Sequence, residues 1–339
     1  MKPHSTQATQ VDPALAIFAK VVVGLTFVLI LLGGHTTTSG AGMAFPDWPL
    51  SDGSLNPQGW LHNVMMRLEH GHRLTAGLVA ILVSVLYGWV LAKRKSLPAR
   101  AHWIALGALL GVFAQAILGG LRVILDPQGI APAAGGISTV FRVLHGCCAQ
   151  AELCLIVTLA AMLSSFWQEM KPQPAWARIS RFAWITVCVI FLQLIVGATM
   201  RHLGAGLAIP TFPFTPDGGI MPKVHNPYVD LNFTHTRFGA ALVTVFVVAL
   251  VVKVFRHSGG EPRLQRPALF LCGLLASQIV LGMFVIWKTR PLMLTTIHVV
   301  NGAAILATTV LLAVRASHGS RESVDHSPEA DLHIREALA

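Results

Sequence analysis

Charged residues are scarce in this sequence. Only 12% of its 339 residues are Asp, Glu, Lys or Arg, whereas 54% are hydrophobic. An ordinary soluble domain contains about 25% charged residues, and the mean hydropathy of this chain is +0.63. So low a charge content excludes an ordinary soluble domain and predicts an integral membrane protein.

Cysteines are missing from the expected loops. All five lie in apolar stretches, at Cys147, Cys148, Cys154, Cys188 and Cys272. A disulfide framework between loops is therefore excluded. The adjacent Cys147 and Cys148 lack the spacing of a metal site, and we interpret them as small buried hydrophobic side chains.

Long apolar runs, by contrast, are abundant. About 20 apolar residues in a helix cross a hydrocarbon core about 30 Å thick. Eight such runs predict membrane-spanning helices at 15–34, 64–92, 102–122, 140–166, 180–200, 232–255, 267–287 and 293–315. The first run has no convincing cleavage site and is followed by further spans, so we expect it to be retained. The predicted fold class is an all-α membrane protein.

Lysine and arginine are distributed unevenly between the expected loops. They gather at 93–101, 167–181 and 253–266, whereas the loop at 35–62 has none. Basic loops stay on the cytoplasmic side, so both termini are predicted to be cytoplasmic, as in a bacterial inner-membrane protein. This topology largely explains the net charge of +10. We therefore expect a lipid bilayer around the chain and no nucleic-acid partner.

The sequence contains an internal repeat. The segment "SGAGMAFPDWP" at 39–49 matches "LGAGLAIPTFP" at 203–213, an offset of 164 residues. An offset of 163 pairs His72 with His235 and Gln115 with Gln278, and His145 pairs with His298 at an offset of 153, because the loop at 122–140 in the first half is longer. The spans therefore predict two pseudo-symmetric four-helix bundles in parallel tandem repeat. The expected parts are an N-terminal segment 1–14, a first bundle 15–166, a linker 167–180, a second bundle 181–315 and a tail 316–339.

Four histidines mark matching positions in the two halves. His72, His145, His235 and His298 fall near the starts of spans two, four, six and eight, all toward the outer leaflet. A histidine inside a span usually has a partner or a function. Two imidazoles facing each other in a bundle can bind a heme iron from both sides. We therefore expect two heme sites, while structural hydrogen bonding, quinone binding and a proton relay stay open. Zinc is disfavoured because each half offers only two ligands.

The stretch "LEHGHRLTAG" at 68–77 adds an acidic residue to one of these sites. Glu69 and His72 are three residues apart and share a helix face, whereas His70 points away from it. The second half has Asn232 at the position that matches Glu69. A carboxylate beside a macrocycle could transfer a proton or stabilise developing positive charge, so Glu69 is the candidate catalytic residue.

Each of these charged candidates has a structural alternative. Glu69 could simply pair with Arg73 or Arg67. Glu152, deeper in the membrane, could conduct protons, although hydrogen bonding within the bundle is slightly favoured. Arg142 lies one turn outward of the histidine on its helix and is placed to bind a heme propionate. Snorkelling to the interface would explain this arginine as well.

These motifs together resemble the heme A synthase family over 15–315. The resemblance rests on "GGHTTTSGAGMAFPDWP" at 33–49, on "LEHGHRLTAG" and on the four span histidines. It implies a duplicated four-helix fold with a resident heme b held by His235 and His298. It also implies that His72 and His145 hold the substrate heme O and that Glu69 is the functional carboxylate.

The implied activity is an oxidoreductase reaction. The C8 methyl group of heme O is oxidised through hydroxylated intermediates to a formyl group, which gives heme A for terminal oxidases. Heme O synthase and an electron donor are candidate partners, and a homo-oligomer is a further candidate. Some members carry a cysteine pair in an outer loop and an aliphatic residue where this chain has His35. The alternative function is a membrane diheme b-type cytochrome that transfers electrons without modifying heme; a transporter or assembly factor is a third.

Overall fold

The computed structural model describes residues 12–125, 136–170 and 173–321. Within these ranges, eight helical segments are long and apolar enough to cross a membrane. They are α1 (Pro13–Thr38), α2 (Val64–Ala92), α3 (Ala99–Ile124), α4 (Ile137–Met162), α6 (Trp176–His202), α7 to α8 (Pro227–His257), α9 (Pro262–Trp287) and α10 (Leu292–Arg321). The predicted all-α, multi-pass membrane fold is confirmed.

The sixth span is not one regular helix. It consists of α7 (Pro227–Phe233), a π-helical turn η3 (Thr234–Gly239) and α8 (Ala240–His257). Three further short helices lie between spans: η1 (Arg94–Ser96), α5 (Ser165–Glu169) and η2 (Ala205–Leu207).

Several predicted boundaries need correction. The fourth span ends at Met162, and the residues expected to continue it form the separate helix α5. The helix α10 reaches Arg321, into the region expected as a tail. Helices extend beyond their apolar runs because their polar ends project past the hydrocarbon core. Most of the expected N-terminal segment and tail, with 126–135, lies outside the described residues.

Polar side chains cap the N-termini of several helices. The side chains of Asp12, Asn63, Asn226 and Glu261 each accept hydrogen bonds from backbone N–H groups in the first turn that follows. Such caps satisfy donors that have no partner inside the helix. The sequence thus sets the start of the second span at Val64, as predicted.

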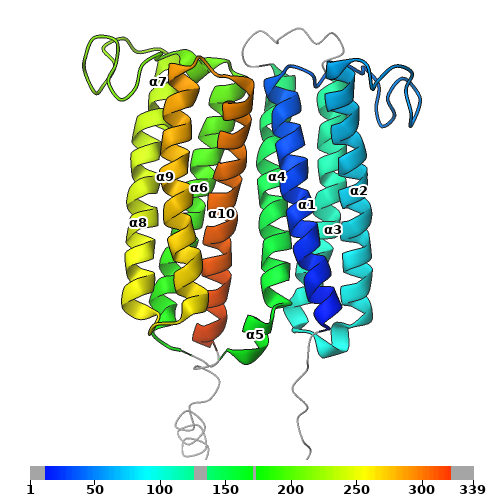
Figure 1. Ribbon diagram of the computed structural model, residues 1–339, viewed down its shortest axis with the longest axis vertical. Coiled ribbons are helices and arrows are strands. Elements are labelled where there is room, and N and C mark those ends of the chain that lie inside the picture. The colour runs from blue at the N-terminus through cyan, green and yellow to red at the C-terminus, as the bar shows by residue number, and fades with distance from the viewer. Residues whose placement is uncertain (1–11, 126–135, 171–172, 322–339) are drawn as a thin grey trace, which may run out of the picture.

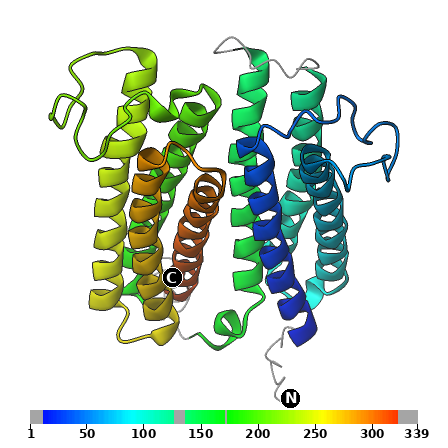
Figure 2. The same cartoon turned by 45° about the horizontal axis from the view of Figure 1, so that its top comes forward.

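The spans lie in two groups. The helices α1 to α4 lie together, α6 and α8 to α10 lie together, and the groups meet through α1, α4, α6 and α10 (Figures 1 and 2). The helix α10 is the most buried span. Its first residue lies at one end of the molecule, and its C-terminal part lies at the opposite end, the same end as the start of α1 (Figure 1). The segments 39–63 and 203–226 lie at the other end, called here the loop end (Figure 1).

The cysteines are all unpaired, as the sequence indicates. Cys147 is buried, but Cys148 is exposed. The interpretation of both as buried side chains was therefore wrong for Cys148. Adjacent residues on a helix point about 100° apart, so only one of the two can face the interior.

Candidate functional site

A cavity of about 1040 Å³ extends through both groups of helices. Small-molecule sites commonly occupy about 300–1,000 Å³. All four predicted histidines line the cavity: His72 on α2, His145 on α4, His235 in η3 and His298 on α10. Each lies among the first nine residues of its span, on the side of the loop end. The structure therefore brings together the four residues that the repeat singled out.

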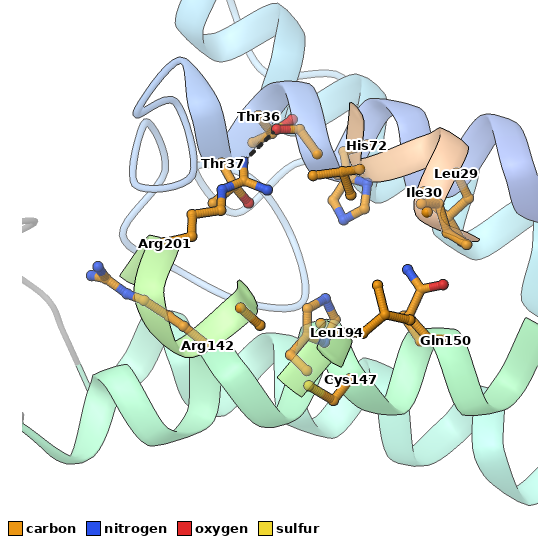
Figure 3. A pocket seen from close by; sticks show the side chains of 18 of the residues that line it. Leu29, Ile30, Thr36, Thr37, His72, Arg142, Cys147, Gln150, Leu194 and Arg201 are labelled. Carbon is orange, nitrogen blue, oxygen red and sulfur yellow. Dashed lines mark hydrogen bonds between the residues drawn. The ribbon is translucent and has the colours of Figure 1, made fainter. Parts of the chain in front are cut away.

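Within the cavity the histidines form two pairs. The imidazoles of His72 and His145 are close enough to interact electrostatically, and so are those of His235 and His298. The Nδ1 atoms of all four are buried, and no described residue hydrogen-bonds them with normal geometry. Figure 3 shows His72 pointing into the cavity. Paired imidazoles of this kind can hold one planar metallo-macrocycle in each half.

A glycine on a neighbouring helix faces each imidazole. A Cβ atom on Gly33, Gly119, Gly197 or Gly282 would lie 2.8, 3.3, 2.5 or 3.3 Å, respectively, from Cε1 of His72, His145, His235 or His298. These four glycines were missed in the sequence. The repeat offers a signal for them. Gly33 and Gly197 are 164 residues apart, and Gly119 and Gly282 are 163 residues apart, which are the offsets of the repeat.

The second histidine pair has additional polar support. The side-chain amide of Gln193 donates to the backbone carbonyl of His235 at 2.7 Å. The amide of Gln278 lies 3.3 Å from Nε2 of His298, and Asn301 donates to the Gln278 carbonyl oxygen at 2.8 Å. The π-helical turn η3 surrounds His235, and such turns are frequent at functional sites. In the first half, α2 is α-helical throughout.

Glu69 is buried in an ion pair. One carboxylate oxygen lies 2.6 Å from the Arg73 guanidinium, and the other accepts the backbone N–H of Phe45 at 3.0 Å. Arg67 donates instead to the carbonyl of Leu61. The structural alternative for Glu69 is thus realised with Arg73. The Glu69 side chain still lines the cavity, on the loop-end side of His72.

The same arginine also holds the first long loop against α2. Arg73 donates to the carbonyls of Phe45, Asp47 and Leu50. Arg237, its counterpart in the repeat, donates to carbonyls of the second long loop. Both guanidinium groups thus hold a long loop against the helix that follows it.

Two neighbours of Arg73 order the loop further. His70, which was predicted to point away from the face of His72, also lines the cavity, but its two ring nitrogens are hydrogen-bonded to Ser51 and Leu55 of the loop. Asp47 accepts the backbone N–H groups of Asp52 and Gly53. Burial raises the pKa of Asp47, but these N–H donors outweigh it and hold the pKa below its ordinary value.

Cations gather at the loop end of the cavity. Arg122, Arg142, Arg201 and Arg290 all contribute to its lining. Arg201 also reaches across to α1, where it donates to the carbonyl of Gly34 at 2.9 Å and to the hydroxyl of Thr38. Figure 3 shows Arg142 and Arg201 at one end of the pocket. This charge favours a ligand with carboxylates on the edge that faces the loops.

Glu152 behaves differently from Glu69. Its side chain is 6% exposed, and neither carboxyl oxygen has a hydrogen-bond partner among the described residues. The favoured expectation that Glu152 bonds within the bundle was therefore wrong. No group of three or more His, Cys, Asp or Glu suited to a metal ion occurs in the described part of the chain.

The comparison with known families bears on this cavity. The model of the cytochrome oxidase assembly protein family matches residues 62–310, a range that includes Glu69 and all four cavity histidines. The chain belongs to this family. The expected family resemblance is thus confirmed over most of the sequence.

Individual members of the family are similar along most of their length. The chain is 28% identical to a heme A synthase of Symbiobacterium thermophilum over 272 residues, which cover 79% of this chain and 84% of that protein. It is 24% identical to a heme A synthase of Bacillus cereus over 321 residues, 91% and 96% of the two chains. A heme A synthase of Geobacillus kaustophilus is also 24% identical, over 89% and 93%.

Proposed function

We propose that this family member is a heme A synthase that oxidises the C8 methyl group of heme O to a formyl group. The observation that carries the proposal is a cavity with two histidine pairs and a carboxylate beside only one of them. The relatives named heme A synthase support it. Two similar sites with one chemical difference suit an enzyme that holds one heme permanently and modifies another.

The residues present fit two hemes. The buried imidazoles, the glycines facing them and the cavity volume together accommodate flat macrocycles. We assign His235 and His298 to a resident heme b, and His72 and His145 to heme O. Arg142 is assigned to a propionate of the substrate heme. When bound, heme b supplies electron transfer to or from the reaction site.

Glu69 is assigned the catalytic role in the first half. Arg73 and the Phe45 N–H group fix its carboxylate at the loop-end edge of that site. A fixed negative charge there can stabilise positive charge that develops as the methyl group is oxidised, or accept a proton. The ordered loop above it can restrict water at the same edge.

The proposal includes the tandem-repeat architecture and its orientation. Matching glycine–histidine contacts and matching arginine–loop contacts in the two halves support a substrate bundle at 15–166 and a heme b bundle at 181–315. The basic loops support a cytoplasmic location for both termini, and with it a position of the loop end outside a bacterial inner membrane.

One observation favours the second candidate, a diheme b-type cytochrome. Both oxygens of Glu69 are hydrogen-bonded, one to Arg73 and one to Phe45, and a purely structural carboxylate would also show this.

Expression of the protein with a heme O source, followed by chromatography of the extracted hemes, distinguishes the enzyme from the electron carrier. Heme A and hydroxylated heme O are expected; heme b alone would support the electron carrier.

The glycine facing His235 gives a test of the resident site. In Gly197→Ala the new Cβ would lie 2.5 Å from His235 Cε1, so the imidazole must move. We expect a shifted or weakened heme b absorption spectrum in the purified protein. Gly273→Ala is the matched control, because nothing lies within 4 Å of a Cβ there. Identical spectra for the two variants would contradict the placement of heme b against His235.

A further inference from the structure

A group of polar side chains without partners lies deep in the first half of the cavity. Glu152 and Gln150 on α4 are 6% and 7% exposed. Among the described residues, no hydrogen-bond partner is present for the two Glu152 oxygens, the Gln150 carbonyl oxygen or the two polar atoms of Gln115 on α3, all of which are buried. Buried polar groups without partners are costly, above all within a membrane, and an ionisable one there indicates a function. This group needs a polar ligand.

The polar group lies one level deeper than the first histidine pair. Along α3, Gly119 faces His145 and Gly111 faces Glu152, with Gln115 on the turn between them. Glu152 follows His145 by seven residues on α4, or about 10 Å at 1.5 Å per residue. Figure 3 shows Arg142 and Arg201 toward one end of the pocket, His72 in the middle and Gln150 pointing into it beyond.

The second half has no such polar group. By the offset of 153 that relates His145 to His298, Ile305 corresponds to Glu152. Gln278 corresponds to Gln115, but its amide is bonded to Asn301 and lies beside His298. The unpartnered groups are therefore confined to the half that we assign to the substrate, and the resident cofactor does not require them.

The chemistry of heme O matches this arrangement. Its propionates lie on one edge of the macrocycle and are drawn to the arginines at the loop end. The opposite edge carries a hydroxyethylfarnesyl chain, which is apolar except for one hydroxyl group, where heme B has a vinyl group. If the propionates are bound at the loop end, that hydroxyl group would be on the edge of the ring that faces Glu152. The C8 methyl group, next to a propionate on the ring, then lies on the edge where Glu69 is fixed.

We propose that Glu152, together with Gln115 and Gln150, hydrogen-bonds the hydroxyl group of the substrate's farnesyl-bearing side chain and so selects heme O over heme B. This inference rests on the proposed function. A site built to bond a hydroxyl group discriminates strongly against an analogue that lacks it, because its own polar groups are then left unpaired. Apolar residues lining the same cavity, among them Leu29, Val79 and Val112, surround the isoprenoid chain.

The test is a titration of the purified protein, loaded with its resident heme, with heme O and with heme B. Binding is followed by the absorption change of the added heme in wild type, Glu152→Ile and Glu152→Gln. Glu152→Ile copies the residue of the second half, and Glu152→Gln retains a hydrogen-bonding group. We expect Glu152→Ile to lower the ratio of heme O to heme B affinity about tenfold or more, and Glu152→Gln to lower it less.

The comparison of ratios separates the hydroxyl group from the apolar tail, which contributes equally in all three proteins. Heme B affinity and thermal stability should be unchanged or higher in Glu152→Ile, because the variant removes an unpaired buried carboxyl group. A ratio equal to that of wild type, or an equal loss of both affinities, would overturn the inference. Such an outcome leaves the proposed function intact as long as wild type binds heme O in its first half and oxidises it. If wild type neither binds nor oxidises heme O, the proposed function itself is wrong.

Discussion

Glu69→Gln is expected to lower the yield of oxidised heme at least about a hundredfold while both hemes stay bound. General acid–base or electrostatic contributions from one group are commonly worth 10²–10⁴-fold. Glutamine keeps one acceptor oxygen, enough for either the Phe45 N–H group or Arg73. Arg73 also donates to three carbonyls of the loop, so the loop should keep its place. The measurement is chromatography of hemes extracted after a fixed reaction time, with the absorption spectrum of each preparation as a check on loading.

The control for this variant is Glu169→Gln. Glu169 also pairs with an arginine, Arg263, but on α5, at the opposite end of the molecule, and it is 56% exposed. The yield of oxidised heme in Glu169→Gln should equal that of wild type. If Glu69 serves only to anchor the loop, Glu69→Gln should instead match wild type in yield per folded protein and differ only in thermal stability. That outcome would remove Glu69 from the catalytic role.

His298→Ala is expected to abolish the heme b spectrum of the purified protein almost completely. The imidazole lines the cavity with Gly282 and Gln278 against it, and alanine offers no iron ligand. His145→Ala is the matched control, because it removes the equivalent residue of the other half. It should retain the heme b spectrum and lose affinity for added heme O. An unchanged heme b spectrum in His298→Ala would contradict the assignment of the cofactor to the second half.

The spans and the histidine pairs were accessible from the sequence for simple reasons. Apolar runs of sufficient length must form helices in a bilayer, because no other partner satisfies the backbone. Val64–Ala92 was predicted with its observed bounds. The repeat then placed His72, His145, His235 and His298 at one depth, and the structure brings them to one cavity.

Features that depend on loop geometry, or on contacts between residues far apart in the chain, could not be predicted from the sequence. An ion pair between Glu69 and Arg73 is readable from their spacing, but the Phe45 N–H group that completes it comes from a loop 24 residues away. The polar helix α7 was missed because it lies before the apolar run. The support of His235 by Gln193 depends on a π-helical turn, which no residue pattern in that span announces.

The surroundings of Glu152 could not be predicted from the sequence either. Its depth was evident from its position in the fourth span, but whether a polar partner faced it depended on how α3 packs against α4. In the structure a glycine, Gly111, faces the carboxyl group. The absence of a partner among the described residues is what turned a buried acid into a candidate for substrate recognition.

The most direct test of the central claim is a single-turnover reaction. Purified protein loaded with heme O would be mixed with a reductant in air, and its hemes extracted and separated over time. We predict that heme O decreases and that hydroxylated heme O and then heme A appear, while the amount of heme b stays constant. Oxidation of the reductant with heme O and heme b both unchanged would contradict the account and identify the protein as an electron carrier.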